Sequence, residues 1–94
     1  MKTVIFCNDL EDGNALVDLI LSKALYNDIE YFTKGWIGTK VIMKNGDSYF
    51  VIRANESARG HKFEKAYVHR NVSDEFVDYV IRPSFTNDVD ISYF

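Results

Sequence analysis

The run Thr3-Val4-Ile5-Phe6-Cys7 constrains the fold more than any other feature of this sequence. Apolar and β-branched residues that follow one another without polar alternation are typical of a fully buried strand. Asn8 and Asp9 come next and carry the side chains that cap a helix N-terminus. A buried strand that leads directly into a helix predicts an α/β fold, with the helix crossing over one face of a sheet.

The segment after Asp9 predicts a helix that runs to about Tyr26. Its polar stripe is narrow and consists of Asn14, Asp18 and Ser22. A helix that is apolar over most of its circumference is covered on more than one side, either by the rest of the domain or by a partner. Because a small domain has only one sheet to cover it, we expect part of the apolar surface to stay exposed as an interface. The interface residues expected on this basis are Leu19, Leu21 and Leu25.

The rest of the chain predicts short strands and a second helix. Lys44-Asn45-Gly46-Asp47 separates the runs 39–43 and 48–53, which predicts a β-hairpin with a type I′ turn. Ser73 is the expected cap of a helix that ends at Arg82, because Pro83 disfavours a helical residue before it. Further strands are expected at 29–32, 63–69 and 88–93, the last as a half-exposed edge strand. The sequence thus predicts one small α/β domain over residues 1–94, with a mixed sheet and two helices.

The composition fits a single globular domain. A chain of 94 residues has no room for a second core, and 47% hydrophobic with 27% charged residues excludes intrinsic disorder. No apolar run approaches the ~20 residues that span a bilayer, and the pattern of a signal peptide is missing. We therefore expect a cytoplasmic protein that does not bind a membrane. Cys7 is the only cysteine, which excludes a disulfide framework.

The charges are segregated along the chain. Residues 32–70 hold eight basic and three acidic side chains, whereas both flanking segments are acidic and the net charge is −3. A basic middle predicts either a phosphate-facing patch or internal ion pairs between the segments. The patch would make the chain a nucleic-acid-binding accessory protein, although the overall acidity argues against a dedicated one. The tentative binding residues are Arg53, Arg59, Gly60, Lys62, Lys65 and Arg70.

Few other side chains suggest chemistry. His61 and His69 lack the spacing of a metal site, and Cys7 at the end of a buried strand is interpreted as a core residue. The acids Asp9, Glu11 and Asp12 are explained by helix capping. Trp36 and the pair Tyr31-Phe32 are either a binding hot spot or, more simply, core. We expect no cofactor and no metal.

Three short motifs follow one another in the second half of the chain: Lys44-Asn45-Gly46-Asp47-Ser48, then Ser57-Ala58-Arg59-Gly60, then the apolar run from Phe63 to Val68. Their order resembles the ATPase core of bacteriophage terminase large subunits. The resemblance spans most of residues 2–83 and implies a reduced RecA-like, P-loop NTPase sheet. In that family a hairpin and an Arg-Gly loop precede the strand that ends in the Walker B acids.

The departures from the family pattern decide the expected function. ATP hydrolysis requires the phosphate cradle G-x-x-x-x-G-K-[ST], and this sequence lacks it. His69 and Arg70 occupy the positions of the Walker B acids and would repel Mg²⁺. The resemblance therefore implies a non-catalytic phage or prophage accessory protein that acts by binding another protein. An enzyme with a site that the sequence does not reveal is the remaining alternative.

Overall fold

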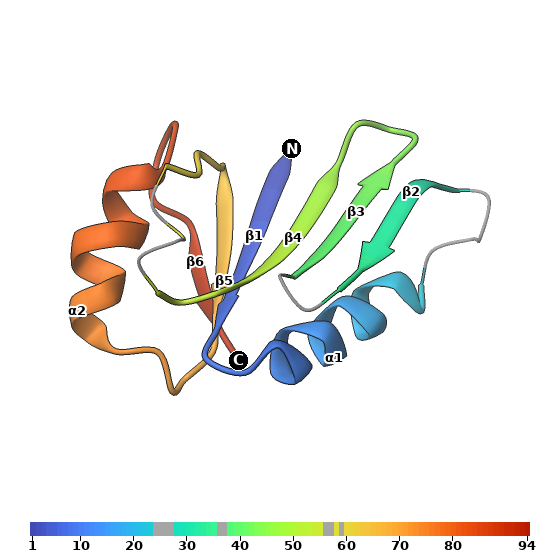
Figure 1. Ribbon diagram of the computed structural model, residues 1–94. Helices are drawn as coiled ribbons and strands as arrows, with labels where there is room; N and C mark the ends of the chain where they lie inside the picture. Colours follow the sequence, from blue (N-terminus) through green and yellow to red (C-terminus); the bar gives the residue numbers. More distant parts are fainter. Residues whose placement is uncertain (24–27, 36–37, 56–57, 59) are drawn as a thin grey trace.

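The computed structural model contains one six-stranded mixed sheet with a helix on each face (Figure 1). It describes residues 1–23, 28–35, 38–55, 58 and 60–94. The first half of the chain forms β1 (Lys2–Cys7), α1 (Leu10–Leu21), β2 (Ile29–Lys34) and β3 (Thr39–Met43). The second half forms β4 (Ser48–Arg53), β5 (Lys65–Val68), α2 (Asp74–Phe76) and β6 (Ile91–Tyr93). The predicted α/β fold, with a mixed sheet and two helices, is confirmed.

The strand order is β2-β3-β4-β1-β5-β6, and β1 lies in the interior of the sheet. It pairs in parallel with β4 on one side and with β5 on the other, and β5 pairs in parallel with β6. The segment β2-β3-β4 is an antiparallel meander. Residues 3–7 of β1 are all buried, as the unbroken apolar run predicts.

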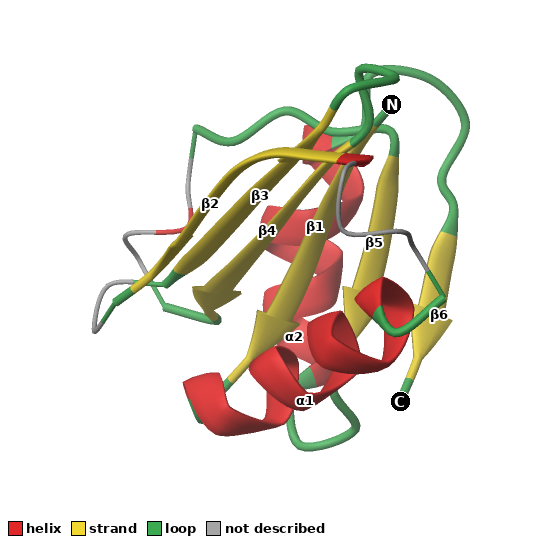
Figure 2. Cartoon of the chain, turned by 90° about the vertical axis from the view of Figure 1, so that its right-hand side faces the viewer, coloured by secondary structure: helices red, strands yellow, loops and turns green. Residues whose placement is uncertain are grey.

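The two helices cover opposite faces of the sheet (Figure 2). Ile5 and Cys7 of β1 pack on the α1 side, whereas Val4 and Phe6 pack on the side of α2. The crossover from β1 to β4 and the crossover from β5 to β6 run in opposite directions across the sheet. Because both crossovers favour the same right-handed sense, this difference in direction places their helices on opposite faces.

The first helix is shorter than the sequence predicts. Asp9 caps it by accepting a hydrogen bond from the Glu11 amide at 3.0 Å. The helix ends at Leu21, where the hydroxyl of Ser22 donates to the Leu19 carbonyl at 2.6 Å. A serine that bonds back to the last helical turn competes with the continuing backbone ladder. The predicted continuation of the helix is therefore wrong at residues 22 and 23, which form a turn, and Tyr26, its predicted end, lies outside the described residues.

The hairpin between β3 and β4 is confirmed, but its turn is of another type. The Gly46 amide donates to the Met43 carbonyl at 3.1 Å, and the Met43 amide donates to Asp47 at 2.8 Å. Gly46 has φ +96°, whereas no described residue other than glycine has a positive φ. A type I′ turn requires positive φ at both central residues. Asn45 therefore occupies a type I turn, and Gly46 forms the bulge of a three-residue loop.

The second helix changes its hydrogen-bond pattern along its length. Ser73 caps it as predicted, accepting from the Phe76 amide at 3.2 Å. After α2 the chain continues as a π-helical turn (Val77–Ile81) and a 3-10 turn (Arg82–Ser84). The predicted end at Arg82 is thus one turn short. Pro83 is tolerated because it lies at the start of the new turn, where its missing amide has no partner to lose.

The two outer strands differ from their predicted bounds by a few residues. β6 is an edge strand, as expected, but begins at Ile91 rather than Asp88. β2 is the other edge and extends to Lys34, with a bulge between Ile29 and Tyr31. The strand predicted at 63–69 is shortened to β5, because Phe63 forms only an isolated bridge with Phe85.

Gly13 allows α1 to approach the sheet closely. A Cβ atom added there would lie 2.9 Å from the Cys7 Sγ and closer still to a methyl group of Val51. Both neighbours are fully buried and have little freedom to move. The distance between the helix and the sheet therefore depends on the absence of a side chain at this position.

Replacing Gly13 by alanine should destabilise the protein by about 1–2 kcal/mol, which lowers the Tm by several degrees in a domain of this size. This is the net change in the free energy of unfolding, because the cost of the steric overlap is reduced by the gain in helix propensity, about 1 kcal/mol. Gly35→Ala is the matched control, since an added Cβ there meets no atom within 4 Å. Thermal unfolding of both variants measures the difference, and a raised Tm for Gly13→Ala would contradict the close-contact argument.

Candidate functional site

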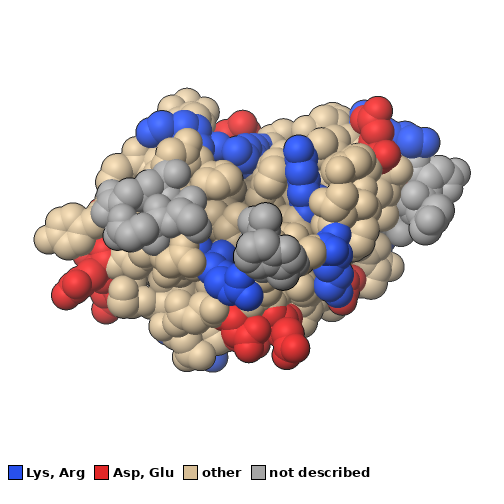
Figure 3. Space-filling model, in the orientation of Figure 1, with Lys and Arg blue, Asp and Glu red and all other residues tan. Residues whose placement is uncertain are grey.

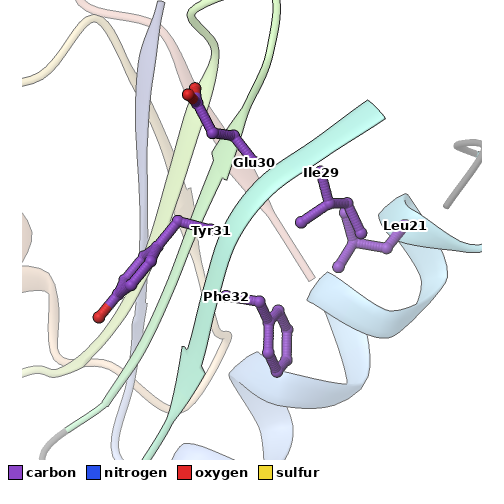
Figure 4. Close-up of a pocket in the computed structure, with 5 residues that line it drawn as sticks. All are labelled: Leu21, Ile29, Glu30, Tyr31 and Phe32. Carbon is purple, nitrogen blue, oxygen red and sulfur yellow. The ribbon is translucent and has the colours of Figure 1, made fainter. Parts of the chain in front are cut away.

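An apolar groove lies between the end of α1 and the edge strand β2 (Figure 4). Its volume is about 380 Å³, and its lining residues are Leu21, Ile29, Glu30, Tyr31 and Phe32. We call it the α1–β2 groove. Leu21, Ile29 and Phe32 converge in the space between the helix and the strand, whereas Glu30 and Tyr31 point away from it (Figure 4).

Local structure explains why these side chains meet. The register places Phe32 opposite Val41, and Val41 belongs to the core cluster beneath α1. Phe32 therefore points to the α1 face of the sheet, but β2 is the edge strand and no further strand covers its outer side. As a result Phe32 remains 44% exposed although it points toward a core cluster.

The structure separates the three leucines predicted to form an interface. Leu21 is half-buried and packs against the core cluster on the α1 face. Leu19 lies on the solvent side of the helix and is 62% exposed, because the buried stripe runs through Leu10, Gly13 and Val17. Leu25 lies outside the described residues. Within the described helix, α1 is thus covered on one side only, and Leu21 and Leu19 belong to different surfaces.

The hot spot considered at Tyr31-Phe32 is partly exposed, as a binding surface requires. Tyr31 is 49% exposed and lies on the opposite face of β2 from Phe32. The simpler interpretation of this pair as core is wrong, because an edge strand has no neighbour to bury both of its faces. Trp36 lies outside the described residues.

The tentative basic residues do not come together in one patch. Arg53 ends β4 and Arg70 follows β5, so both lie at the carboxyl end of the parallel strands. Lys65 begins β5, and Gly60 and Lys62 precede it, so these three lie at the amino end. Arg59 is outside the described residues. The fold therefore does not gather the described basic residues of 53–70 into a single phosphate-facing patch.

One of these cations forms the internal ion pair that the charge pattern allowed. The Lys65 Nζ lies 3.0 Å from the Asp90 carboxylate and also donates to the Ser92 hydroxyl at 3.1 Å. The Lys65 side chain is only 18% exposed. The pair joins the basic middle of the chain to its acidic end and helps to hold β6 against β5.

A polar cluster at the carboxyl ends of β1 and β5 has a structural explanation. The Nδ1 atom of His69 accepts a hydrogen bond from the Asn71 amide at 3.2 Å, and its Nε2 atom faces the Asp12 carboxylate at 3.7 Å. The Asn8 side chain donates to the Asn71 carbonyl at 2.9 Å. Both ring nitrogens of His69 thus contact other residues of the protein. Sequence spacing did not indicate this cluster, because its members come from opposite ends of the chain.

Cys7 is a core residue, as the sequence indicates. It is fully buried, and its thiol donates to the Ile52 carbonyl at 3.7 Å. Burial raises the pKa of the Cys7 thiol above its usual value, with the nearby Asp12 and Asp9 carboxylates adding to the effect. A thiol with a raised pKa is a poor nucleophile at neutral pH. Within the described residues, no group of three or more His, Cys, Asp or Glu side chains is placed to hold a metal ion.

The comparisons with known proteins assign no family to the chain. No protein-family model, curated protein or solved structure matches it. None of the described helices is both long and apolar enough to cross a membrane. The geometry of the surfaces therefore carries the functional argument.

His61 should make the stability of the protein depend on pH. Partial burial, and secondly the positive charge of Lys2, lower the pKa of His61 below its ordinary value of 6.5. The unfolded chain therefore binds this proton more readily than the folded one, and the free energy of unfolding should fall as the pH is lowered through about 6.5. Urea unfolding between pH 8 and pH 5 measures the slope. His61→Asn, which is neutral throughout, should flatten it, and equal slopes for both proteins would contradict the assignment.

Proposed function

We propose that this chain is a non-catalytic accessory protein that binds a partner protein through the α1–β2 groove. The observation that carries the proposal is the convergence of Leu21, Ile29 and Phe32 in an open cavity at an uncovered sheet edge. Exposed apolar side chains that gather in a concave site mark protein interfaces more often than scattered ones do.

The charges around the groove specify the chemistry of the partner. Among the described lining residues Glu30 is charged, and its side chain lies at the rim, pointing away from the apolar centre of the groove. Asp18 lies exposed on α1 three residues before Leu21. Residues three apart on a helix are neighbours on its surface, so Asp18 borders the groove. An apolar cavity bordered by carboxylates complements a segment with an apolar anchor residue flanked by lysine or arginine. We therefore expect a partner segment of that kind.

The terminase resemblance supports placing this protein among the accessory proteins of a phage or prophage, in the host cytoplasm. The missing phosphate cradle supports a binding role rather than catalysis. On this proposal the fold is a reduced form of the ATPase core that has kept a binding surface and lost the nucleotide site.

Panning of short random displayed peptides on the immobilised protein tests the groove. We expect the enriched sequences to share one large apolar residue with lysine or arginine beside it. Affinities of the best peptides, measured by fluorescence anisotropy, should fall by about tenfold or more in Phe32→Thr, because loss of an anchor contact costs more than ~1 kcal/mol. Threonine retains the β-propensity of the strand, so the fold should persist.

Matched variants separate the groove from general surface stickiness. Tyr79→Thr removes an aromatic side chain that is 73% exposed on the other helical segment, and it should leave the peptide affinity unchanged. Glu30→Lys should lower the affinity for the basic peptides. It should not lower the affinity for versions of these peptides in which glutamine replaces lysine and arginine. Equal losses in Phe32→Thr and Tyr79→Thr, or enrichment without an apolar and basic pattern, would overturn the proposal. If the wild type forms a dimer and Phe32→Thr dissociates it, the occupant of the groove is a second copy of the chain rather than a different protein.

The protein should bind neither ATP nor ATP·Mg²⁺, because the backbone cradle and the acids that such a complex requires are missing from the sequence. Isothermal titration calorimetry with ATP·Mg²⁺ checks this, with the expected result that no saturable heat appears up to millimolar nucleotide. Micromolar binding of ATP·Mg²⁺ at one site would refute the proposal of a non-catalytic protein and would favour an enzyme.

A further inference from the structure

A second surface lies over β2, β3 and β4 on the face of the sheet opposite to α1. Phe50 points to this face, because it packs with the core cluster that contains Val4 and Phe6. Lys40 pairs with Phe50 in the register, so its side chain lies on the same face. Tyr31 joins them from β2 and Lys2 from the start of β1. We call these four residues (Lys2, Tyr31, Lys40 and Phe50) the aromatic–lysine face.

None of the described helices covers the aromatic–lysine face. The helical segment of residues 74–84 packs over β1 and β5, and Figure 1 shows that it lies far from β2 and β3. Tyr31 is 49% exposed, Lys40 is exposed and Phe50 is half-buried. A hollow of about 250 Å³ lies beside Lys40 and Phe50. The surface is thus accessible to a ligand.

The lysines alternate with the aromatic rings. The Lys40 Nζ lies 5.9 Å from the centre of the Tyr31 ring and 5.6 Å from that of Phe50. The Lys2 Nζ lies 4.8 Å from the centre of the Phe50 ring. Neither lysine forms an ion pair with any residue that the structure describes. No described carboxylate therefore neutralises their charges. Because each ammonium lies over a ring, a flat group that stacks on Tyr31 or Phe50 takes the place of the flexible lysine head, which turns to an anionic group beside it.

The charge of this face is positive although the chain as a whole is acidic. Among the regularly paired strand residues that point to it, the charged ones are Lys2 and Lys40. Glu30 at the bulge points to the same side of β2 as Tyr31 (Figure 4), and the Glu64 amide donates to the Lys2 carbonyl, so these two acids lie at its rim. Figure 3, which shows one side of the molecule, shows Lys and Arg side chains singly or in small groups both near the centre and at the edges, and acidic side chains mostly toward the edges. A face of this composition complements a ligand that carries both anionic groups and flat rings.

We propose that the aromatic–lysine face binds single-stranded nucleic acid. Bases stack on the rings of Tyr31 and Phe50, and the phosphates beside them are neutralised by Lys40 and Lys2. Stacking on aromatic side chains and phosphate contacts from a basic surface are the two elements that sequence-tolerant single-strand binding requires. This site shares Tyr31 with the lining of the α1–β2 groove but lies on the other face of β2 from Phe32, because Tyr31 and Phe32 point to opposite faces (Figure 4).

Fluorescence anisotropy with a labelled oligo-deoxythymidine tests the proposal. The logarithm of the affinity should fall with the logarithm of the salt concentration with a slope of about −1.4, since each neutralised single-strand phosphate contributes about 0.7. Tyr31→Ala should weaken binding by about fivefold or more, whereas Tyr31→Phe, which keeps the ring, should retain it. Tyr31 is half-exposed, so neither change should unfold the chain, and circular dichroism checks this.

A matched pair of double variants locates the phosphate contacts. Lys2→Ala with Lys40→Ala should bring the salt slope close to zero. Lys62→Ala with Arg70→Ala removes the same charge from the basic stretch that the sequence suggested, and it should leave the slope unchanged. The opposite result would place binding on that stretch and overturn the proposal.

Two other results would also overturn it. One is the absence of saturable binding at about 50 mM salt, where phosphate contacts are strongest. The other is displacement of the oligonucleotide by polyglutamate of equal charge, together with an affinity that Tyr31→Ala does not change. That result would show a surface that attracts any polyanion without stacking. Loss of binding in Phe32→Thr would instead assign the oligonucleotide to the groove.

Discussion

The structure depends on the burial of residues 3–7 of β1. The backbone of β1 is paired in parallel on both edges, by β4 and β5, and the side chains of residues 3–7 are covered on both faces. A backbone polar group that is buried without a partner costs free energy comparable to a lost hydrogen bond, so the strand is stable only where both neighbours are present. Each neighbour brings its own crossover, and these crossovers place one helix on each face. Gly13 then lets α1 approach this strand closely enough to seal the face beneath it.

The same arrangement leaves the outer half of the sheet incompletely covered. The two helices pack near β1, but the meander extends the sheet through β4 and β3 to β2. Within the part of the chain that the structure describes, no further helix covers that extension. One consequence is the groove where the end of α1 meets the edge strand, and the other is the open face that carries Tyr31 and Lys40. Both proposed sites thus arise because the sheet is wider than its helical layers.

The edge strand itself has features that limit uncontrolled pairing. The bulge between Ile29 and Tyr31 interrupts the regular ladder, and Glu30 and Lys34 place charges along it. Bulges and charges are common means by which sheet edges avoid adding a further strand. Binding through the side-chain surfaces on the two faces of β2 is compatible with these features, whereas extension of the sheet by another strand is not favoured by them.

Sequence reasoning determined the local elements whose signals lie within a few residues. The buried strand, the caps at Asp9 and Ser73 and the Asn-Gly hairpin follow from local hydrophobicity, capping chemistry and backbone preference. Together they predicted the α/β class. The tertiary structure alone decided which surfaces form. It divided the basic stretch between two ends of the sheet, engaged Lys65 with Asp90 and brought Lys2 beside Phe50. These outcomes depend on strand order and register, which join residues far apart in the chain and have no local signature in the sequence.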